Sequence, residues 1–384
     1  MKRLLIIGTV MLVGLPWLPA DSWTELFPPT VPPARYGHTL TRVGDVLYLF
    51  GGRGNPPPGA KPGPELNDIW SFNNDLFEGI DATAPPPVRF GHGAAGSGGK
   101  LWVAFGFGDL STRGDAHAFD PAAGSWAPVT AGSVPARSFP ALAPFPDGSL
   151  YLFGGLSSDG SIALPDLWRF SPGTSAWSVL LSMPGTGRYG AMGFQAGGKL
   201  YVFGGDDMSA YSSALWVFDP ASGAWSDTMA SNPPPARAFG AVASSGDRAW
   251  VFGGEDAAGN PLQDTWEYSV AGNAWTRKTD LPLPLAGAAA AMRTEVGSPA
   301  VLVFGGRGLG GLAMAKVFLY RPDGSPAGDI NGDGVVDAAD YLLLATFLSG
   351  VPSQWGFETP EAADVNGDGA LDAMDLVALL LLLI

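Results

Sequence analysis

The sequence predicts an all-β propeller of six blades, followed by a small α-helical domain built around two acidic loops. Two observations predict the propeller. A phrase that ends in Phe-Gly-Gly recurs about every fifty residues, and aromatic residues recur at similar distances after each copy. The second domain is predicted because the acidic pattern of residues 329–340 is repeated at residues 364–375.

The composition fits a chain of many short strands. Glycine (55) and proline (35) are abundant, as turns require, while 13 Trp, 21 Phe and 9 Tyr supply the apolar surface that disordered chains lack. A length of 384 residues is enough for two or three domains.

Charge and cysteine content exclude several classes of function. The net charge is −15, no Lys or Arg follows Arg321, and ten of the 36 acidic residues lie between Asp329 and Asp375. Such a chain has no basic surface for nucleic acid, so no nucleic-acid partner is expected. The lack of cysteine excludes disulfides, thiolate catalysis, zinc–sulfur sites and a lipid-anchored cysteine.

Residues 1–20 have the pattern of a secretory signal peptide. Lys2 and Arg3 precede an apolar run, and small residues lead to Ala20, after which cleavage is expected. The run is short for a membrane span and is interrupted by glycine and proline, and the final "LVALLLLLI" is shorter still. We therefore expect a secreted or cell-surface protein with no transmembrane segment in the mature chain.

The repeated phrase is read most clearly in "LYLFGG", which occurs twice, and in "LYVFGG", "AWVFGG" and "VLVFGG". A degenerate copy, "LWVAFGFG", covers residues 101–108. The first glycine after the phenylalanine stands at residues 51, 106, 154, 204, 253 and 305. Paired glycines at the end of a strand tolerate positive φ and let neighbouring backbones approach closely.

Each copy is flanked by the same two phrases. An arginine segment such as "PPARYGH" precedes it, and an aromatic strand, a turn and a tryptophan follow it, as in "DLWRFSPGTSAW". Large apolar residues alternate with small or polar ones within each phrase, which is typical of strands. Four strands in each of six repeats predict six blades.

Recurring aromatic residues are expected to fill the wedges between blades, because each ring can remove about 150–250 Å² from water. They are Trp70, Trp168, Trp216 and Trp266 in third strands, with His117 and Phe318 in the same slot of the second and sixth repeats, and Trp126, Trp177, Trp225 and Trp275 in fourth strands. The sixth repeat has no fourth strand, and "DSWTEL" near the N-terminus carries the missing tryptophan, Trp23. We therefore expect the N-terminal strand to complete the last blade and close a propeller over residues 22–321.

This pattern resembles the kelch family. The resemblance implies a propeller fold, and some kelch propellers are enzymes. Galactose-oxidase-like copper proteins depend on a cysteine-crosslinked tyrosine, which a chain without cysteine cannot form. Kelch-like sialic-acid mutarotases need no metal, so this type of activity stays open.

Loops after the glycine pairs carry the non-repeating residues, and loops on a rigid scaffold often carry function. The candidate ligand face consists of Arg53, Asp206, Asp207, Glu255, Asp256 and Arg307. Acidic residues on two blades and arginines on two others suit a sugar or a peptide. The alternative is that these are solvated loop charges.

Histidines and the repeated arginines have a structural and a functional interpretation. His38 and His92 occupy equivalent positions after the arginine, and His117 occupies an aromatic slot, which favours roles in the fold. The repeated arginines could hold an anion at one end of the channel, or bond the backbones of the blades. They are Arg35, Arg89, Arg137, Arg188 and Arg237.

The two acidic loops match the spacing of an EF-hand calcium loop. The first loop supplies Asp329, Asn331, Asp333, the carbonyl of Val335, Asp337 and Asp340 at positions 1, 3, 5, 7, 9 and 12. The second supplies Asp364, Asn366, Asp368, the carbonyl of Ala370, Asp372 and Asp375 at the same positions. Crowded carboxylates repel one another without a cation, so the spacing predicts one hard divalent ion in each loop, two calcium ions in all.

A helix is expected after each loop but not before it, and this arrangement over residues 329–384, joined by a linker at 322–328, resembles a type I dockerin. The resemblance implies two bound calcium ions and docking onto a cohesin. Positions 10 and 11, where that family commonly has Ser or Thr for cohesin recognition, hold Ala338, Ala339, Ala373 and Met374. An unusual cohesin-like partner and a calcium-stabilised terminal domain therefore both stay open.

Together these features predict an exported, non-catalytic propeller that binds a glycan or a protein and is tethered to an extracellular complex through its calcium-loaded C-terminal module. The alternative is a carbohydrate-active enzyme of the same assembly, of the glycoside hydrolase or sugar mutarotase type. No pair of converging carboxylates is visible in the sequence, so no catalytic residue is assigned.

Overall fold

The computed structural model describes residues 21–58, 62–293 and 299–322, and residues 340–342, 344, 345, 365, 375 and 379 near the C-terminus. Chain contacts separate residues 21–322 from a second unit made of residues 1–20 and 323–384. The expected signal peptide and linker residues 323–328 lie outside the described residues. So do all the expected calcium ligands except Asp340 and Asp375.

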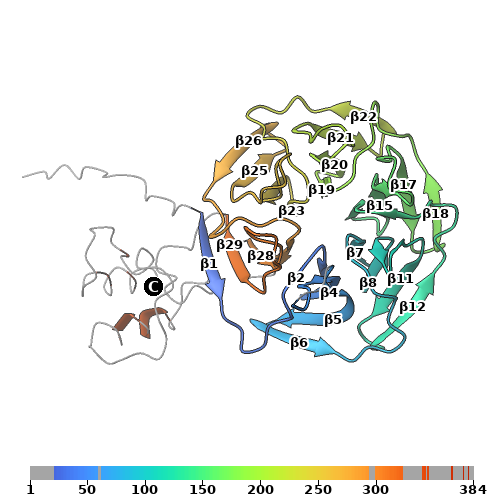
Figure 1. Ribbon diagram of the computed structural model, residues 1–384. Helices are drawn as coiled ribbons and strands as arrows, with labels where there is room; N and C mark the ends of the chain where they lie inside the picture. The colour runs from blue at the N-terminus through green and yellow to red at the C-terminus, as the bar shows by residue number, and fades with distance from the viewer. Residues whose placement is uncertain are drawn as a thin grey trace, which may run out of the picture. The chain divides into compact units, whose positions relative to one another are not determined.

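Residues 21–322 form six antiparallel sheets arranged in a ring around a central channel (Figure 1). Blade 1 consists of β3 (Thr39–Val43), β4 (Val46–Gly54), β5 (Glu65–Asn73) and β6 (Leu76–Ile80). Blade 2 consists of β7 (Gly93–Ser97), β8 (Lys100–Ala104), β11 (Ala116–Asp120) and β12 (Ser125–Val129). Blade 3 consists of β14 (Ala141–Pro144), β15 (Leu150–Phe153), β17 (Leu167–Ser171) and β18 (Ala176–Val179). Blades 4 to 6 consist of β19 (Met192–Ala196), β20 (Lys199–Phe203), β21 (Leu215–Asp219) and β22 (Ala224–Asp227); β23 (Ala241–Ser245), β24 (Arg248–Phe252), β25 (Thr265–Ser269) and β26 (Ala274–Lys278); and β27 (Ala289–Arg293), β28 (Ala300–Phe304), β29 (Val317–Arg321) and β1 (Ser22–Leu26). Short strands β2 (Arg35–Tyr36), β9 (Phe107–Gly108), β10 (Ser111–Thr112), β13 (Arg137–Ser138) and β16 (Leu156–Ser157) lie in the connections.

The N-terminal strand completes the last blade, as the sequence predicts. Strand β1 pairs with β29 from Ser22 opposite Arg321 to Leu26 opposite Val317, so the sheet order is β1-β29-β28-β27. In Figure 1, β1 lies at the outer edge of the blade that contains β28 and β29. Joining the two ends of the domain in one sheet leaves no blade short of a strand.

The glycine pairs are required where the second strand of each blade ends. Gly154 and Gly155 have φ values of 65° and 106°, and a Cβ on Gly154 would stand 2.3 Å from the carbonyl oxygen of Arg188. Blade 2 differs from the predicted alignment by one residue, because Phe105 itself takes the first positive-φ position (64°) and Gly106 the second (96°).

Aromatic packing joins every blade to the one before it. The side chain on the fourth strand contacts the phenylalanine that ends the preceding blade's second strand, or Phe105 in blade 2. The pairs, with ring-centroid distances, are Trp126–Phe50 (4.8 Å), Trp177–Phe105 (6.0 Å), Trp225–Phe153 (5.5 Å), Trp275–Phe203 (4.7 Å), Trp23–Phe252 (5.4 Å) and Phe77–Phe304 (5.4 Å). The fourth-strand aromatic residue of blade 1 is Phe77, which the tryptophan pattern did not reveal.

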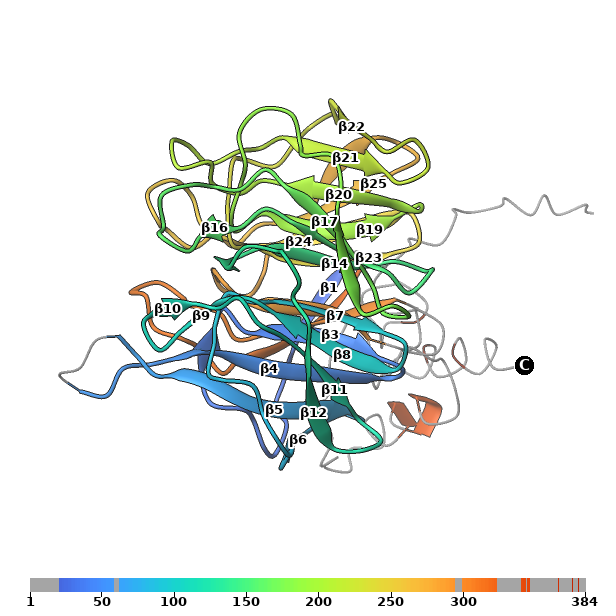
Figure 2. The ribbon, with the colours of Figure 1, turned by 90° about the vertical axis from the view of Figure 1, so that its right-hand side faces the viewer.

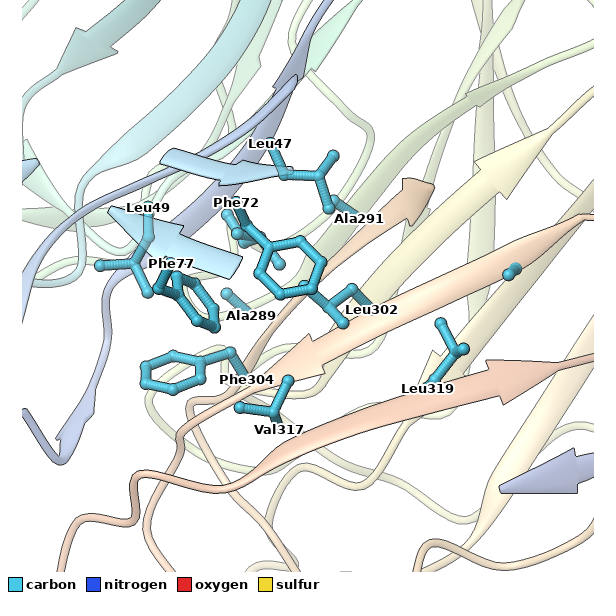
Figure 3. Close-up of a cluster of buried hydrophobic side chains, with 12 residues drawn as sticks. Leu47, Leu49, Phe72, Phe77, Ala289, Ala291, Leu302, Phe304, Val317 and Leu319 are labelled. Atoms are coloured by element: carbon cyan, nitrogen blue, oxygen red, sulfur yellow. The ribbon is translucent and has the colours of Figure 1, made fainter. Parts of the chain in front are cut away.

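Figure 3 shows the interface that closes the ring. Side chains from β4, β5 and β6 of blade 1 interdigitate with side chains from β27, β28 and β29 of blade 6, and Phe77 faces Phe304. Every labelled side chain is nearly excluded from solvent. Burial of this kind contributes about 25 cal/mol for each Å² of apolar surface removed from water.

A closed belt of backbone hydrogen bonds runs around the channel just before the first strands. Each donor lies two residues after the arginine position of its repeat, which is Leu285 in blade 6, and donates to the carbonyl of the equivalent residue in the preceding repeat. The bonds are Gly91 to Gly37 (2.7 Å), Phe139 to Gly91 (2.6 Å), Gly190 to Phe139 (3.0 Å), Phe239 to Gly190 (2.8 Å), Gly287 to Phe239 (2.8 Å) and Gly37 to Gly287 (2.8 Å).

The side chains of four of the repeated arginines bind groups within their own blades rather than lining the channel. Arg35, Arg89, Arg137 and Arg237 are 0% exposed. Each is bidentate to one aspartate and also donates to the carbonyl of the first positive-φ residue of its blade. For Arg137 these bonds reach Asp166 (2.7 and 2.8 Å) and Gly154 (2.9 Å).

In the C-terminal unit the described residues show two matching helical positions. Asp340 and Asp375 are helical and 0% exposed, and Leu344 and Leu379, four residues further on, are also 0% exposed. The equivalent burial of these two aspartate–leucine pairs agrees with the repeat of residues 329–340 at residues 364–375. Within the described part of the chain, no helix has the length and hydropathy needed to cross a membrane.

Candidate functional site: the aromatic mouth of the channel

Two cavities follow the propeller axis. The larger, about 490 Å³, is lined by the first strands of all six blades, and the smaller, about 330 Å³, lies at one end. Both cavities contact His38, His92, Pro140, Ala191, Gly240 and Ala288, so they meet there. We call the smaller cavity, lined by the belt residues together with Tyr36 and Arg307, the mouth. The short strands β9, β10 and β16 and the long β4–β5 hairpin extend from one side of the propeller in Figure 2.

Aromatic side chains form the rim of the mouth. Phe139 and Phe239 are half-buried, and their rings are 5.3 Å apart. Both have positive φ, 54° and 56°, at belt positions that are glycine in the other four repeats. A bulky residue in this conformation is strained, and strain of this kind is concentrated at functional sites. Tyr189 joins the same cluster, 6.4 Å from Phe139 and 5.9 Å from Phe239.

Two candidate residues, Glu255 and Arg307, meet Tyr211 beside this rim. Glu255 is 5% exposed; it accepts a hydrogen bond from the Tyr211 hydroxyl (2.7 Å) and pairs with Arg307. Because these residues follow β20, β24 and β28, one carboxylate connects the loops of blades 4, 5 and 6. Arg307 also lines the mouth, as Phe139 and Phe239 do.

Arg53 and Asp206 do not line the mouth themselves but bind aromatic residues beside it. The guanidinium of Arg53 lies 3.8 Å above the ring centre of Phe90 and pairs with Glu65. Asp206 accepts a hydrogen bond from the Tyr189 hydroxyl. Burial and this bond to Asp206 raise the pKa of Tyr189, so the phenol stays protonated.

Asp207 and Asp256, the other two candidates, bind their own loops. The Oδ1 of Asp207 accepts hydrogen bonds from Ser209 and from the backbone of Ala210. The carboxylate of Asp256 accepts bonds from the backbone of Ala258 and from Asn260. Both side chains shape the loops that hold Asp206 and Glu255.

His38 and His92 lie between the two cavities and are neutral. Burial and the charge of Arg35 lower the pKa of His38 to about 3, and burial with Arg89 keeps the pKa of His92 well below its ordinary value. His92 shares a hydrogen bond with Thr39 (2.9 Å). His117 occupies its predicted third-strand slot and bonds Asp115 (2.9 Å). These positions support roles in the fold.

Apolar rings beside a few fixed polar groups are what a small-molecule site requires. Sequence reasoning found the charged part of this rim and missed the aromatic part. The signal was present, because a phenylalanine replaces the belt glycine in "ARSFP" and "ARAFG".

Comparison with known proteins identifies the family. Residues 18–188 and 147–326 match the KLHDC2/KLHL20/DRC7 Kelch-repeats domain, which together covers most of the chain. The chain belongs to the kelch-repeat family. Its kelch propeller is 28% identical to Kelch domain-containing protein 3 of Bos taurus over 264 residues, 60% of this chain and 66% of that protein.

Other relatives are similar over smaller shares of their length. Adagio-like protein 1 of Oryza sativa subsp. japonica is 26% identical over 287 residues, 65% of this chain and 44% of the relative. N-acetylneuraminate epimerase 2 of Escherichia coli O6:H1 (strain CFT073) is 27% identical over 208 residues, 44% of this chain and 55% of the relative. The chain thus spans less than two thirds of the length of these curated relatives.

The C-terminal segment is a dockerin type I domain, which matches residues 327–381. Domains of this type typically bind calcium and pair with cohesins in extracellular, cellulosome-type assemblies. Of the expected ligands, the described residues include only Asp340 and Asp375. Both are fully buried carboxylates, which fits position 12 of a calcium loop, because buried carboxylates need a cation or hydrogen-bond donors. No cluster of three or more potential metal ligands occurs among the residues that the structure describes.

Proposed function

We propose that this protein is a secreted binding protein whose propeller holds a glycan at the mouth and whose dockerin domain attaches it to an extracellular complex. The observation that carries the first part is the pair of strained phenylalanines beside fixed polar groups, Phe139 and Phe239 with Glu255 and Arg307. The C–H face of a sugar ring packs against an aromatic face, while its hydroxyls need donors and acceptors at the edge. The mouth supplies both.

The size and the position of the mouth suit one or two sugar units of a longer chain. A volume of about 330 Å³ is at the lower end of the range for small-molecule sites. The similarity to an N-acetylneuraminate epimerase supports a sugar as the ligand class. A protein ligand is the alternative occupant and would have to insert a side chain between the rings.

The attachment part rests on the dockerin match and on the loop spacing. We propose that Asp329, Asn331, Asp333, Val335, Asp337 and Asp340 hold one calcium ion, and that Asp364, Asn366, Asp368, Ala370, Asp372 and Asp375 hold a second. Calcium would order the loops, and the ordered module would bind a cohesin-like partner. Export would follow from the signal-like residues 1–20.

Glycan binding is tested by removing the aromatic rim without breaking the fold. The double variant Phe139→Gly, Phe239→Gly restores the residue that the other four repeats carry at this position, and it removes the strain of a side chain at positive φ. We expect it to stay folded and to bind any glycan that the native chain binds at least about 10-fold more weakly, which corresponds to about 1.4 kcal/mol. The measurement is titration calorimetry of the full chain after screening on a glycan array.

The control is Phe27→Gly, because Phe27 is 80% exposed and does not line the mouth. Undiminished glycan binding by the double variant would show that the glycan binds elsewhere than at the mouth. Binding of peptides but of no glycan would replace the sugar by a protein ligand.

A carbohydrate-active enzyme is the second candidate, because Asp206 and Glu255 both reach the mouth region through tyrosines. Both carboxylates are already engaged, Glu255 with Arg307 and Asp206 with Tyr189, which favours binding over acid–base chemistry. Hydrolysis or mutarotation of a sugar by the full chain, lost in Glu255→Gln or Asp206→Asn but kept in Asp256→Asn, would favour the enzyme instead.

A further inference from the structure

The arginine–aspartate pairs occupy equivalent positions in four blades, so the remaining blades can be compared with them. In blades 1, 2, 3 and 5 the aspartate stands two residues before the third-strand aromatic residue, and its carboxylate accepts from two kinds of donor. In blade 5, Asp264 accepts both ends of the Arg237 fork (2.6 Å each) and the indole N–H of Trp266 (2.6 Å). Asp68 and Asp166 are bound in the same way by Trp70 and Trp168.

Blade 4 keeps the donors and lacks the carboxylate. The Nη1 of Arg188 donates to the carbonyl of Gly204 (3.1 Å), as the Nη1 of Arg237 does to Gly253 (3.0 Å), so the two guanidinium groups are placed alike. Trp216 pairs with Val202 as Trp266 pairs with Val251. Two residues before Trp216, however, stands Ala214. Its backbone is placed like that of the aspartates, because Gly204 donates to its carbonyl (3.2 Å).

The side chain of Arg188 is left with spare donors. In the four paired arginines Nε donates to a proline carbonyl two residues earlier, at 2.9 to 3.1 Å. The equivalent Nε of Arg188 is buried without a partner. Among the described residues, neither Nη2 of Arg188 nor the indole nitrogen of Trp216 has an acceptor.

Nearby acids do not replace the missing aspartate. Burial lowers the pKa of Arg188, and the charges of Asp207 and Asp227 oppose this shift, so both acids lie near it. Their oxygens are used elsewhere. Asp207 binds its own loop and Thr186 (3.1 Å), and Asp227 accepts from the backbone of Met229 (3.0 Å). Neither makes an ion pair with Arg188 in the part of the chain described.

Blade 6 lacks both members of the arginine–aspartate pair. Leu285 stands at its arginine position and Lys316 at its aspartate position, so both charges of the pair are gone. Lys316 pairs with Glu25 of β1 instead. A half-buried arginine without its acid is costly, because leaving one member of such a pair alone leaves a charge poorly solvated. Blade 4 alone keeps this arrangement among the six.

We propose that blade 4 binds the carboxylate group of an external ligand between Arg188 and Trp216, where the other blades place an aspartate. A planar carboxylate matches the arginine fork, as four internal copies demonstrate, and it can also accept an indole N–H, as it does in blades 1, 3 and 5. The site is open to solvent, since Arg188 is half-buried while the four paired arginines are 0% exposed. The ligand is either a free small acid or a uronate unit of an acidic glycan.

The test uses the full chain with calcium and compares sodium acetate with sodium chloride at equal ionic strength. Acetate should raise the melting temperature of the propeller in a saturable way, by about 2–4 °C at ten times Kd, and chloride should not. The variant Ala214→Asp fills the site from within, so it should melt higher than the native chain and lose the response to acetate.

Arg188→Met is the second variant, and it should lose the acetate response even if Ala214→Asp does not fold. An equal response of the native chain to acetate and chloride would overturn the proposal. An unchanged acetate response in both variants would do the same, since the ion would then bind elsewhere.

Glucuronate and galacturonate oligomers, compared with neutral oligosaccharides of equal length, distinguish the two sources of the carboxylate. Binding of the uronate oligomers at least 10-fold tighter than acetate, lost in Ala214→Asp, identifies an acidic glycan. Equal affinities for uronate and acetate identify a free small acid. The proposal does not depend on which ligand the mouth binds, because Phe139→Gly, Phe239→Gly should leave the acetate response intact.

Discussion

At the scale of single residues, the four arginine–aspartate pairs place eight charge-assisted hydrogen bonds inside the blades. Burial alone would raise the pKa of Asp68, Asp115 and Asp264, yet the bound arginines, with an indole or imidazole donor, hold all three below the ordinary value. These three aspartates are therefore ionised at neutral pH. Their role is to fix the geometry of the segments that carry the mouth.

Removing one aspartate tests that role. We expect Asp166→Ala to lower the free energy of unfolding by about 3 kcal/mol, because Arg137, 0% exposed, would keep its charge without its acceptor. The measurement is urea denaturation of the full chain. The matched control is Asp280→Ala, whose partner Arg277 is 59% exposed, and where a loss of at most about 1 kcal/mol is expected. Equal losses in the two variants would contradict a structural role for the buried pair.

At the scale of elements, the propeller depends on one strand taken from the opposite end of the domain. Strand β1 supplies Trp23, whose ring contacts Phe252 of blade 5 (5.4 Å) and whose indole nitrogen donates to the Thr279 carbonyl (3.0 Å). In the other blades the fourth strand is joined to the third by a short hairpin. In blade 6 no hairpin joins the fourth strand, β1, to the third strand, β29. The attachment of β1 therefore depends on strand pairing and side-chain packing alone.

We expect Trp23→Ala to cost about 3 kcal/mol of unfolding free energy, through lost packing and the lost hydrogen bond. It should also expose residues 21–27 to limited proteolysis, because β1 would detach before the other strands. Thr24→Ala, on the opposite face of the same strand, is the control and should change stability by less than about 1 kcal/mol. Cleavage starting in another blade would show that the ring does not open at β1.

Prediction from the sequence succeeded where a feature repeats. Blade number, the aromatic wedges and closure by β1 all follow from spacing, because each blade must bury the same surface against the same neighbour. It failed where a copy departs from the repeat. Phe77 was not found because it is not a tryptophan, and the shift at Phe105 was hidden because the degenerate copy still contains Phe-Gly.

The candidate site was predicted only in part for a related reason. Loop charges such as Glu255 and Arg307 stand out because they do not repeat, but their pairing depends on which blades are neighbours in space. The rim of Phe139 and Phe239 depends on positive φ, which composition does not reveal. The aspartates paired with the arginines were visible in "DLW" and "DTW", and the contrast with "ALW" in blade 4 gains its meaning only from the bidentate geometry.

At the scale of the whole molecule, one chain carries two domains for which we expect a different dependence on calcium. The kelch propeller takes its stability from apolar burial and internal ion pairs. The dockerin domain is small, and its two loops contain ten aspartate and asparagine residues, which we propose as calcium ligands. A small domain with so little core of its own should need the metal to fold.

We therefore expect calorimetry of the full chain to show two transitions, of which only one responds to calcium. With 1 mM calcium and a Kd of about 1 µM, the dockerin domain gains about 4 kcal/mol, and a chelator should abolish its transition while the propeller still melts at the same temperature.

Asp333→Ala combined with Asp368→Ala removes one expected ligand from each loop and should weaken calcium binding at least about 10-fold. Capture of a cohesin should fail in this variant and in the presence of a chelator. Calcium titration that shifts neither transition would contradict the ligand assignment. Intact calcium binding without capture of any cohesin would instead indicate a calcium-stabilised terminal domain. The lack of cohesin binding would then be explained by the residues at the recognition positions, which are Ala338, Ala339, Ala373 and Met374.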